Sequence, residues 1–558
     1  MNLAIKDNKR KHLVLLAMLL VFQVIIYAPQ VGTGFVTDDF VWLDNTVVNG
    51  QVDFLKPFTE TTGFFRPMVN LTIGIQYYVH GLNPLPYGWL NLLLHLANIL
   101  LVYLVLDSVE ISRPYALWAA ALFAVNAKGP TMAVGWISGR TTLLFSFFML
   151  LSLYFYLKVR LHGSEKAGTY KRIMQYTGIG MIYFAALLSK ETAAALPIFV
   201  FLAAAITEKE GLEQRWRGFF KNTRTALLNT LVFLVPLAVY LVLRMNSNAM
   251  TPLNAPAFYR YSYSPLTLFG NLAEYIIRSG LWEIAVILWL IILLIFMRRE
   301  TGGRERIDGR VLVAGSGWFL CFLLPTVLIP ARSDIYVYVP QVGIHVVALA
   351  VIFYLWKRTG ISHYEKRNRV AVLVPVVILA AAAIVHLVLA TAAYSKRGHS
   401  AAEFTREVRR LFLPLLPLKT GERIFIIDME AGRGASPGRT VAYGFAPLLN
   451  VFFPGRELRG EIIPPGKVSG LTCDTLPPLF FVWGQGKLIG PLNCRDMETA
   501  FYFLCPGQTF LIKIEEWSKK WKYRRFYRLK KRQEWKRKLQ EELKEREKEK
   551  KAADRTLN

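Results

Sequence analysis

Acidic residues, cysteine and histidine are all scarce in this chain. Its 558 residues include 39 Asp and Glu against 67 Lys and Arg, with 4 Cys and 8 His. None of the Cys residues lies in a CxxC pair or in a Cys/His spacing typical of a metal site, so we expect no metal centre and no thiol chemistry. The phosphate-binding loop, GxSxG, HExxH and dinucleotide-binding patterns are absent too, which leaves the enzyme classes that they mark without support.

Apolar residues, in contrast, are abundant and lie in long runs. They make up 53% of the sequence, and the mean hydropathy is +0.32. A soluble domain of this size rarely has a positive mean hydropathy, whereas a protein with many membrane spans covers each of them with apolar side chains. The net charge of +28 does not indicate a nucleic-acid partner, because the basic residues cluster between the apolar runs.

Eleven apolar runs are long enough, or nearly long enough, to be predicted as transmembrane helices. The first follows Lys6, Lys9, Arg10 and Lys11, and we expect a retained helix because no small-residue cleavage site ends it. The runs cover roughly 12–27, 87–106, 115–127, 134–157, 173–188, 193–206, 226–243, 281–297, 311–329, 336–356 and 370–393. Several are shorter than the ~20 residues that a perpendicular helix needs.

Basic residues in alternate connections predict the orientation of the chain. They occur near 113 and within 158–172, 209–224, 298–310 and 357–369. The positive-inside rule places these connections and the N-terminus in the cytoplasm. With an odd number of spans, the C-terminal part is then expected on the exoplasmic (periplasmic) side of an inner or plasma membrane.

Three regions are predicted along the chain. Residues 1–398 form the α-helical transmembrane domain, whose first external loop covers about 29–86 and carries an amphipathic interfacial helix over 67–80. Residues 399–514 form a small exoplasmic α+β domain, and 515–558 a basic tail that is helical or disordered. The tail is interpreted as a solvated helix, with attraction to anionic headgroups or glycan as the alternative.

The small α+β domain is predicted from short apolar segments separated by Gly and Pro turns. The segments 423–429, 479–482 and 510–514 are typical of strands, and 441–453 of an apolar helix. In an oxidising compartment a disulfide is expected among Cys473, Cys494 and Cys505. The pair Cys473–Cys494 closes a loop of suitable size, but the spacing leaves the pairing open.

Ionisable and tyrosine residues near the exoplasmic ends of the spans are the candidates for chemistry. A charge beside hydrocarbon is costly and persists where it has a partner or a role. These residues are Asp38, Asp39, Arg66, Arg140, Lys190, Glu191, Arg332, Asp334, Tyr336 and Tyr338. Structural roles compete: an Asp can cap the helix that follows, Lys190 and Glu191 can pair, and Arg140 can reach the headgroups.

A pair of carboxylates opposite several cations suits the transfer of a group from an anionic lipid phosphate to a hydroxyl. A carboxylate can accept the proton of the acceptor hydroxyl, while Arg and Lys stabilise the charge that grows on the departing phosphate. The predicted topology places all the candidates on one side of the membrane, which favours one common site.

Several short motifs occur in an order that resembles a known family. They are TDDFVWLDN at 37–45, FRPMVNL at 65–71, GLNPLPY at 81–87, NLLLHLAN at 91–98, GWISGR at 135–140, LSKET at 188–192 and YVYVP at 336–340. This set resembles the membrane region of the C-class (GT-C fold) polyprenyl-phosphate-sugar-dependent glycosyltransferases, in the protein O-mannosyltransferase-like branch. The resemblance covers about residues 1–400, without the tetratricopeptide repeats of animal members.

The resemblance implies an inverting transfer of a sugar, often mannose, from a polyprenyl-phosphate donor to a protein, glycan or lipid hydroxyl on the exoplasmic face. It maps the acidic motif of the family onto Asp38 as general base, with Asp39 orienting. Candidates for the donor phosphate are Arg332, Arg140, Lys190, Tyr336, Tyr338 and Arg66, with Glu191 in support.

Two departures from the family affect the prediction about metal. Met132 and Thr142 stand where the family commonly has acids. The missing carboxylates favour metal-independent chemistry with no cofactor, the lipid-linked sugar being a substrate. They also keep open a catalytically degenerate scaffold that binds glycan. A transporter or flippase of a lipid-linked saccharide is the other alternative, although we find no internal repeat and the charges gather at one face.

Overall fold

A computed structural model describes residues 9–48, 50–59, 63–109, 112–162, 169–207, 215–247, 249, 255–297, 307–359, 366–412, 423–431, 436–455, 458–464, 479–484 and 486–492. The chain divides into two compact units, Met1–Pro491 and Leu492–Asn558. The described residues belong almost entirely to the first unit, and the fold below is that of this unit.

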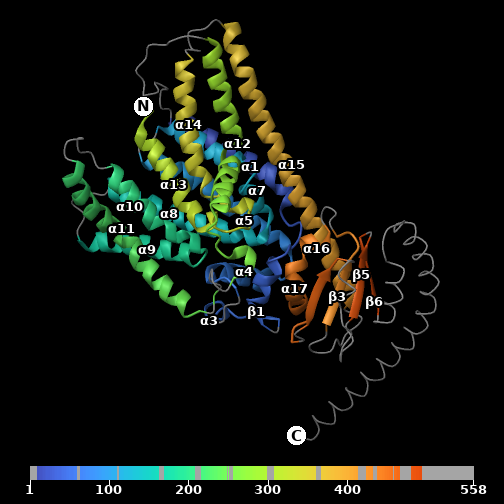
Figure 1. Ribbon diagram of the computed structural model, residues 1–558. Coiled ribbons are helices and arrows are strands. Elements are labelled where there is room, and N and C mark those ends of the chain that lie inside the picture. The colour runs from blue at the N-terminus through green and yellow to red at the C-terminus, as the bar shows by residue number, and fades with distance from the viewer. Residues whose placement is uncertain are drawn as a thin grey trace, which may run out of the picture. The chain divides into compact units, whose positions relative to one another are not determined.

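Helices dominate the described chain (Figure 1). A helix coincides with each of the eleven predicted apolar runs. These helices are α1 (Lys9–Tyr27), α5 (Pro84–Ser108), α6 (Arg113–Val125), α8 (Arg140–His162), α9 (Thr169–Leu187), α10 (Ala195–Thr207), α11 (Arg215–Met245), α12 (Pro265–Met297), α13 (Gly309–Val327), α14 (Gln341–Arg358) and α15 (Lys366–Phe412).

Seven of the described helical segments are long and apolar enough to cross a membrane: those in α1, α5, α8, α12, α13, α14 and α15. Two further apolar segments, Glu191–Ala204 and Thr230–Met245, are shorter. The predicted helical protein with many spans is thus confirmed, with fewer full-length spans than the eleven expected. The orientation of the termini stays a prediction.

Helices α12 and α15 extend beyond their predicted bounds. The apolar run was expected from 281, but α12 begins at Pro265 and is broken at Gly280, whose φ of −143° and ψ of 33° are not helical. Helix α15 continues to Phe412, past the predicted domain boundary at 398, and runs from the bundle to the C-terminal sheet (Figure 1). Polar residues in the first part of α12 and the last part of α15 lower the hydropathy there, so hydropathy alone did not predict these parts as helix.

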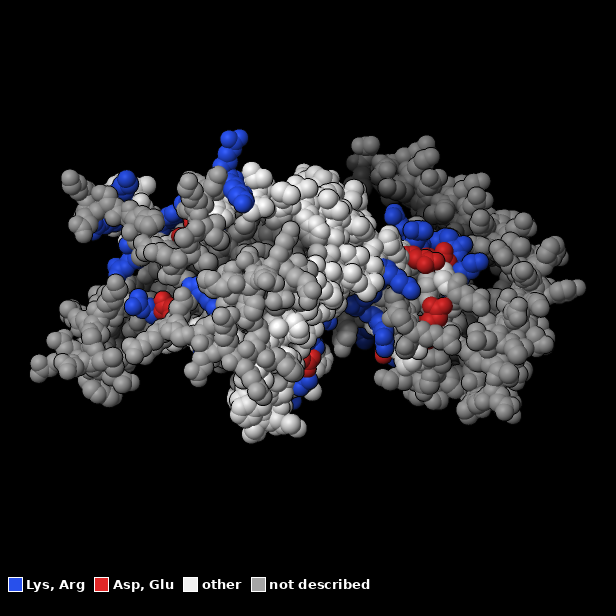
Figure 2. Space-filling model, turned by 90° about the horizontal axis from the view of Figure 1, so that it is seen from above, with Lys and Arg blue, Asp and Glu red and all other residues white. Residues whose placement is uncertain are grey.

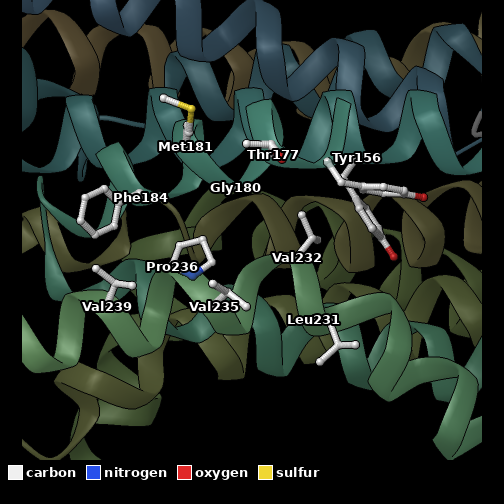
Figure 3. A pocket seen from close by; sticks show the side chains of 11 residues that line it. Tyr156, Thr177, Gly180, Met181, Phe184, Leu231, Val232, Val235, Pro236 and Val239 are labelled. Atoms are coloured by element: carbon white, nitrogen blue, oxygen red, sulfur yellow. The ribbon is translucent and has the colours of Figure 1, made fainter. Parts of the chain in front are cut away.

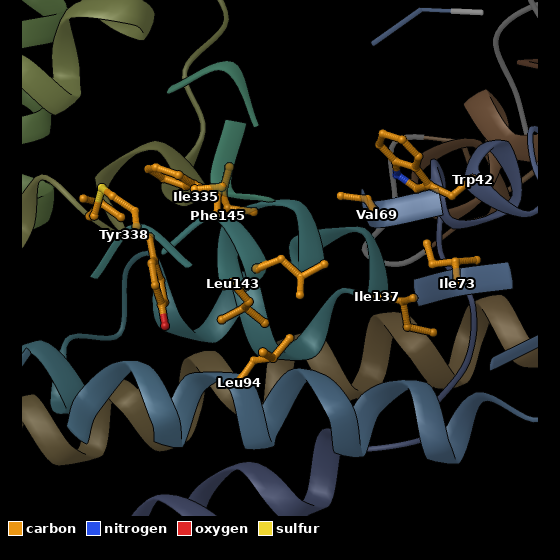
Figure 4. Packing of buried hydrophobic residues seen from close by; sticks show 14 of the residues in the cluster. Trp42, Val69, Ile73, Leu94, Ile137, Leu143, Phe145, Ile335 and Tyr338 are labelled. Carbon is orange, nitrogen blue, oxygen red and sulfur yellow. The ribbon is translucent and has the colours of Figure 1, made fainter. Parts of the chain in front are cut away.

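The connection between α1 and α5, predicted as the first external loop, is folded into short elements that pack on the long helices. Its elements are η1 (Ala28–Gln30), α2 (Asp39–Asp44), β1 (Val47–Val48), β2 (Gln51–Val52), α3 (Lys56–Thr59) and α4 (Pro67–His80). Helix α4 confirms the amphipathic helix predicted over 67–80, since it buries Val69 and Ile73 and exposes Tyr78 and Val79. Figure 4 shows Trp42, Val69 and Ile73 of this loop in one apolar cluster with Leu94 of α5 and Leu143 of α8.

The C-terminal part of the unit contains a four-stranded sheet in the order β4-β3-β5-β6. Its strands are β3 (Arg423–Asp428), β4 (Arg459–Ile463), β5 (Leu479–Gly484) and β6 (Lys487–Leu492). Strand β3 is parallel to both neighbours, so the β3–β4 connection crosses over. That connection holds α16 (Pro437–Thr440), η9 (Ala442–Gly444) and α17 (Phe445–Phe452).

The strands predicted at 423–429 and 479–482 and the helix within 441–453 are confirmed, while β4 and β6 were not predicted. The last turns of α15 pack on the sheet, where Phe404 contacts Trp483 and Phe412 contacts Phe481. The expected strand at 510–514, the basic tail and Cys473, Cys494 and Cys505 lie outside the described residues. Cys321, in α13, is a buried free thiol.

The described surface has a broad region without charge. Figure 2 shows this uncharged surface with Lys and Arg gathered at several places around it. Large apolar side chains are exposed on the spans, for example Met18 at 62%, Ile295 at 67% and Val377 at 64%. Exposed apolar side chains of this kind on spanning helices suit contact with lipid.

Two glycines allow α13 and α14 to approach closely. A Cβ placed on Gly315 of α13 would lie 2.8 Å from the Gly343 carbonyl oxygen of α14, whereas a Cβ on Gly317 would meet nothing within 4 Å. Small residues let membrane helices pack backbone against backbone.

We expect Gly315→Ala to lower the melting temperature of the purified protein in detergent. The overlap with α14 should cost about 1–3 kcal/mol, more than the ~1 kcal/mol that Ala gains over Gly in a helix. Gly317→Ala is the matched control on the same helix and should melt at or above the wild-type temperature. Equal melting temperatures for the two variants would contradict the close approach of α13 and α14.

Candidate active site

Asp38 and Asp39 stand together at the start of α2, but their carboxylates have different surroundings. Asp39 accepts hydrogen bonds from the Val36 N–H at 2.7 Å and from the Ser138 N–H at 2.7 Å, and its Oδ1 also accepts from the Ser138 hydroxyl. Asp38 occupies the N-cap position without a capping hydrogen bond from its side chain. Among the described residues its carboxylate has no hydrogen-bond partner, so it is the more available of the two.

Burial affects the two carboxylates to different extents. Asp39 is 1% exposed, and burial raises its pKa to about 7 although the hydrogen bonds from Ser138 and Val36 lower it. Asp38 is partly exposed, and burial also raises its pKa, while the positive charge of Arg66 lowers it. The structure therefore combines a buried acid, Asp39, with a partly exposed acid, Asp38, that interacts with the positive charge of Arg66.

Arg66 and Glu191 form a two-pronged ion pair next to Asp38. Arg66 lies at the start of α4 and donates from Nε to Glu191 Oε2 at 3.0 Å and from Nη2 to Oε1 at 2.7 Å. Its guanidinium also lies 4.1 Å from the ring centre of Phe64. Glu191 opens the short helix η3 (Glu191–Ala194). Residues 125 positions apart in the sequence thus meet at one place.

Lys190, which directly precedes Glu191, helps to line a small cavity. Its side chain is 6% exposed, donates to Thr142 Oγ1 at 2.8 Å and lies 5.7 Å from the ring centre of Tyr336. The cavity that these three residues help to line has a volume of about 10 Å³, roughly enough for one water. Burial, and secondly Arg66, lower the pKa of Lys190 to about 7.

Tyrosines and a further arginine complete the cluster around Arg66 and Glu191. Tyr259, at the end of η5 (Ala257–Tyr259), is an electrostatic neighbour of Asp38, Arg66 and Tyr336. Tyr240 and Arg244 of α11 are electrostatic neighbours of Glu191. Tyr240, Arg244 and Tyr259 were not among the predicted site residues. Arg244 is a charge at the end of the apolar run 226–243, and Tyr259 lies in a Tyr-rich connection, so both features were present in the sequence.

Arg140, predicted for the donor phosphate, has a different position in the structure. It is 0% exposed, and its three nitrogens donate to Asn91 Oδ1 at 3.0 Å, to Gln76 Oε1, and to the Tyr87 carbonyl oxygen at 2.8 Å. With no exposed surface, Arg140 has no face to offer a phosphate here. It instead joins α4, α5 and α8.

Tyr338 is likewise fully buried. Its hydroxyl is 2.8 Å from His95 Nδ1 and accepts from Asn98 Nδ2 at 3.2 Å, which places the ring in the core between α5 and the α13–α14 connection (Figure 4). The tyrosine that faces the Arg66 cluster is Tyr336.

Arg332, also predicted for the phosphate, belongs to a second charged network. Arg332 pairs with Glu274 and donates to Asn271 Oδ1 at 2.7 Å. Arg278 pairs with Glu274 and, at 2.7 Å, with Asp334, which accepts from Lys128 Nζ at 3.2 Å as well. No hydrogen bond or ion pair among the described residues links this network with Asp38, Arg66 or Glu191. The rings of Tyr275 and Tyr336 are in contact between the two groups of residues.

Met132 and Thr142, which stand where the family that the chain resembles commonly has acids, make contacts of other kinds. Met132 Sδ lies 3.4 Å from the Ser333 hydroxyl, and Thr142 accepts from Lys190. Within the part of the chain that the structure describes, no group of three or more His, Cys, Asp and Glu residues is arranged to hold a metal ion. Metal-independent chemistry stays a prediction.

The raised pKa of Asp39 predicts a pH-dependent stability. Because the folded state binds this proton more tightly than the unfolded chain, the stabilisation is full below pH 3.8 and is lost as the pH rises through about 7. Asp39→Asn removes the titrating group. The melting temperature of the wild type relative to Asp39→Asn should therefore fall between about pH 4 and pH 8.

Asp53→Asn serves as the control, because Asp53 is exposed and lies outside the turn; its melting curve should follow the wild type across the same range. A difference between wild type and Asp39→Asn that stays constant with pH would mean that Asp39 has the same charge throughout.

Comparison with known proteins gives partial matches in sequence. No family model matches the chain. It is 31% identical over 186 residues to the protein O-mannosyl-transferase Tmtc1 of Drosophila melanogaster, which is 30% of this chain and 20% of that protein. It is 29% identical over 160 residues to the protein O-mannosyl-transferase F38B6.6 of Caenorhabditis elegans, which is 26% of this chain and 23% of that protein. The chain thus spans less than a quarter of the length of these curated relatives.

Solved structures are similar only at a low level. The apo oligosaccharyltransferase of Archaeoglobus fulgidus has a TM-score of 0.44 at 14% identity, covering 75% of this chain and 63% of that one. ArnT from Cupriavidus metallidurans bound to undecaprenyl phosphate has a TM-score of 0.44 at 12% identity, covering 84% and 92%. The sequence matches confirm the predicted resemblance: over less than a third of its length, this chain is similar to protein O-mannosyl-transferases.

Proposed function

We propose that the protein is a membrane glycosyltransferase that moves a sugar, with mannose the first candidate, from a polyprenyl-phosphate donor to a hydroxyl on the exoplasmic face. The proposal rests chiefly on Asp38, a partly exposed carboxylate beside Arg66 and without a hydrogen-bond partner among the described residues. The similarity to protein O-mannosyl-transferases supports the reaction class.

In the proposed reaction Asp38 is the general base. It takes the proton from the acceptor hydroxyl while the hydroxyl oxygen attacks the anomeric carbon of the donor sugar. The bond between that carbon and the phosphate oxygen breaks, and the lipid phosphate leaves with the bonding electrons. Attack from the face opposite the phosphate inverts the configuration. Asp39, held by Ser138 and Val36, fixes the turn that carries Asp38.

Arg66 and Lys190 are the cations assigned to the departing phosphate. Glu191 uses Arg66 Nε and Nη2, while Nη1 makes no hydrogen bond within the described chain and is the donor that we assign to the phosphate. Lys190 already has a depressed pKa because it is buried, and an arriving anion favours its charged form. A cation placed where negative charge develops lowers the barrier directly.

An apolar cavity near this cluster supports a lipid-linked donor. It has a volume of about 750 Å³ and lies among α8, α9 and α11 (Figure 3). Figure 3 shows Met181 and Phe184 of α9 across from Val235 and Val239 of α11. Val239 directly precedes Tyr240, the neighbour of Glu191, so a lipid chain in this cavity would have its phosphate end near Arg66.

A catalytically inactive scaffold that binds glycan is the second candidate. Met132 and Thr142, in place of the acids common in the family that the chain resembles, are the observations that favour it. A flippase for lipid-linked saccharide would use the same cavity. It differs from a transferase because it moves the lipid across the bilayer without forming a product bond.

We expect Asp38→Asn to abolish most of the transfer activity. The full chain in lipid nanodiscs would be given radiolabelled polyprenyl-phosphate mannose and a pool of Ser- and Thr-containing peptides. Loss of the general base should lower kcat about 10²- to 10⁴-fold with little change in donor KM, whereas Asp53→Asn should leave both unchanged. Transfer at the wild-type rate would refute Asp38 as the base. Movement of labelled lipid in liposomes without any peptide product would instead identify a flippase.

Metal-independent chemistry gives a separate prediction. Transfer of radiolabelled mannose should continue at the same rate after dialysis against EDTA, because Met132 and Thr142 supply no carboxylate at the two departures. Loss of transfer in EDTA, with recovery on addition of Mg²⁺ or Mn²⁺, would overturn this part of the proposal.

A further inference from the structure

Thr37, the residue immediately before Asp38, has an unusual backbone conformation. With a φ of 43°, it is the non-glycine residue with positive φ in the described part of the chain. A β-branched residue is strongly disfavoured there, and such a conformation persists only where the surroundings impose it. The neighbours of Thr37 therefore bear on how Asp38 is held.

Those neighbours come from the C-terminal part of the chain. The Thr37 N–H donates to the Thr440 carbonyl oxygen at 2.7 Å, at the end of α16. The carbonyl oxygen of Thr37, in the next peptide unit, lies against Gly444, where a Cβ would overlap it. Thr37 is thus enclosed by two backbone contacts from one short segment, and Gly444 is the residue type that this approach requires.

The same segment also contacts the rest of α2. The ring of Phe452 in α17 packs edge-on against Phe40, with 6.3 Å between the ring centres. Asn450 Nδ2 lies 3.4 Å from Asp44 Oδ2 at the end of the helix. Both ends of the short helix that follows Asp38 therefore rest on residues 436–453.

This segment is in turn tied to the sheet. Asp428 at the end of β3 is 1% exposed; its Oδ2 accepts from the Gly438 N–H at 2.8 Å and its Oδ1 from the Glu430 N–H at 3.0 Å. Leu448 and Leu449 of α17 are fully buried. A continuous series of hydrogen bonds and packed side chains thus leads from the sheet through α16 to Thr37.

We propose that residues 436–453 position Asp38, with Gly444 and Thr440 as positioning residues, so that the exoplasmic reaction depends on the C-terminal sheet region. This inference rests on the proposed function for its catalytic consequence. The structural claim, that this segment sets the conformation of the 37–39 turn, does not depend on the proposed function. It is tested separately by amide hydrogen exchange.

The test is Gly444→Ala in the full chain, reconstituted in nanodiscs. The added methyl group must displace Thr37, so amide hydrogen exchange in the peptide 35–45 should become at least severalfold faster. The melting temperature should fall as well, as for Gly315→Ala, because the methyl group overlaps backbone. In the mannose-transfer assay kcat should fall about tenfold to hundredfold, as expected for a misplaced reactive group, with donor KM unchanged. Adding Thr37→Gly to Gly444→Ala should bring the exchange rate of the peptide 35–45 and kcat back toward the wild-type values, because Gly allows the turn to move at little cost.

Gly484→Ala is the matched control, since a Cβ there would meet only Met429 Cβ, at 3.7 Å; it should behave as wild type. If Gly444→Ala does not fold, Phe452→Ala gives the second arm, with Phe452→Leu retaining the bulk, and the faster exchange should again be confined to 35–45. Unchanged exchange in that peptide would overturn the inference whatever the activity. Changed exchange together with a wild-type protein that transfers no sugar would overturn only the proposed function.

Discussion

The hydrogen bonds that enclose the Asp39 carboxylate hold together the region on which the rest of the candidate site depends. Ser138 belongs to the turn that starts α8, and Val36 to the loop that enters α2. One buried acid therefore joins the first external loop to a spanning helix. Because a buried carboxylate is costly unless its oxygens are satisfied, this arrangement discourages any other position of the loop. Asp38, one residue away, obtains a defined position without having to use its own oxygens for structure.

The charged residues around this turn fall into two kinds. Arg140 is surrounded by acceptors on two helices, α4 and α5, and has a structural role. Arg66 and Lys190 are buried to a similar degree yet leave donor capacity unused. Burying a cation is tolerated when acceptors satisfy it, so the cations with incomplete partners are the ones suited to an anionic substrate. Arg140 therefore differs from Arg66 in two respects: acceptors satisfy its guanidinium, and it has no exposed surface.

The sequence predicted much of the fold because apolar runs report directly on spanning helices. It missed the first half of α12 because Asn271, Glu274 and Arg278 make that stretch polar. Their partners, Arg332, Asp334 and the Val327 carbonyl oxygen, come from a distant connection. Strand β4 was missed for a similar reason, since Arg459 and Glu461 interrupt its apolar pattern and only pairing with β3 reveals it.

For the candidate site, the sequence predicted that these residues gather on one face but not which of them pair. Arg66 and Glu191 were both expected there, and the structure joins them. The sequence did not reveal that acceptors satisfy the Arg140 guanidinium, or that the Thr440 carbonyl oxygen accepts from Thr37. Each of these contacts joins residues that are far apart in the sequence. Hydropathy and charge reveal which residues sit at a membrane boundary, whereas hydrogen-bond partners are a property of the folded chain.

The charge balance of the cluster explains why the same residues suit an anionic lipid. Asp38 and Glu191 are both electrostatic neighbours of Arg66, and Glu191 is also a neighbour of Arg244, so two acids lie near two arginines in the cluster. Lys190 is the adjustable member, because burial lowers its pKa to about 7 and neighbouring charge decides its protonation. A phosphate beside Lys190 favours the ammonium form, and its departure favours the neutral amine again. Under the proposed function, the cluster therefore gains positive charge when the lipid phosphate brings negative charge, without keeping an unpaired cation buried in its absence.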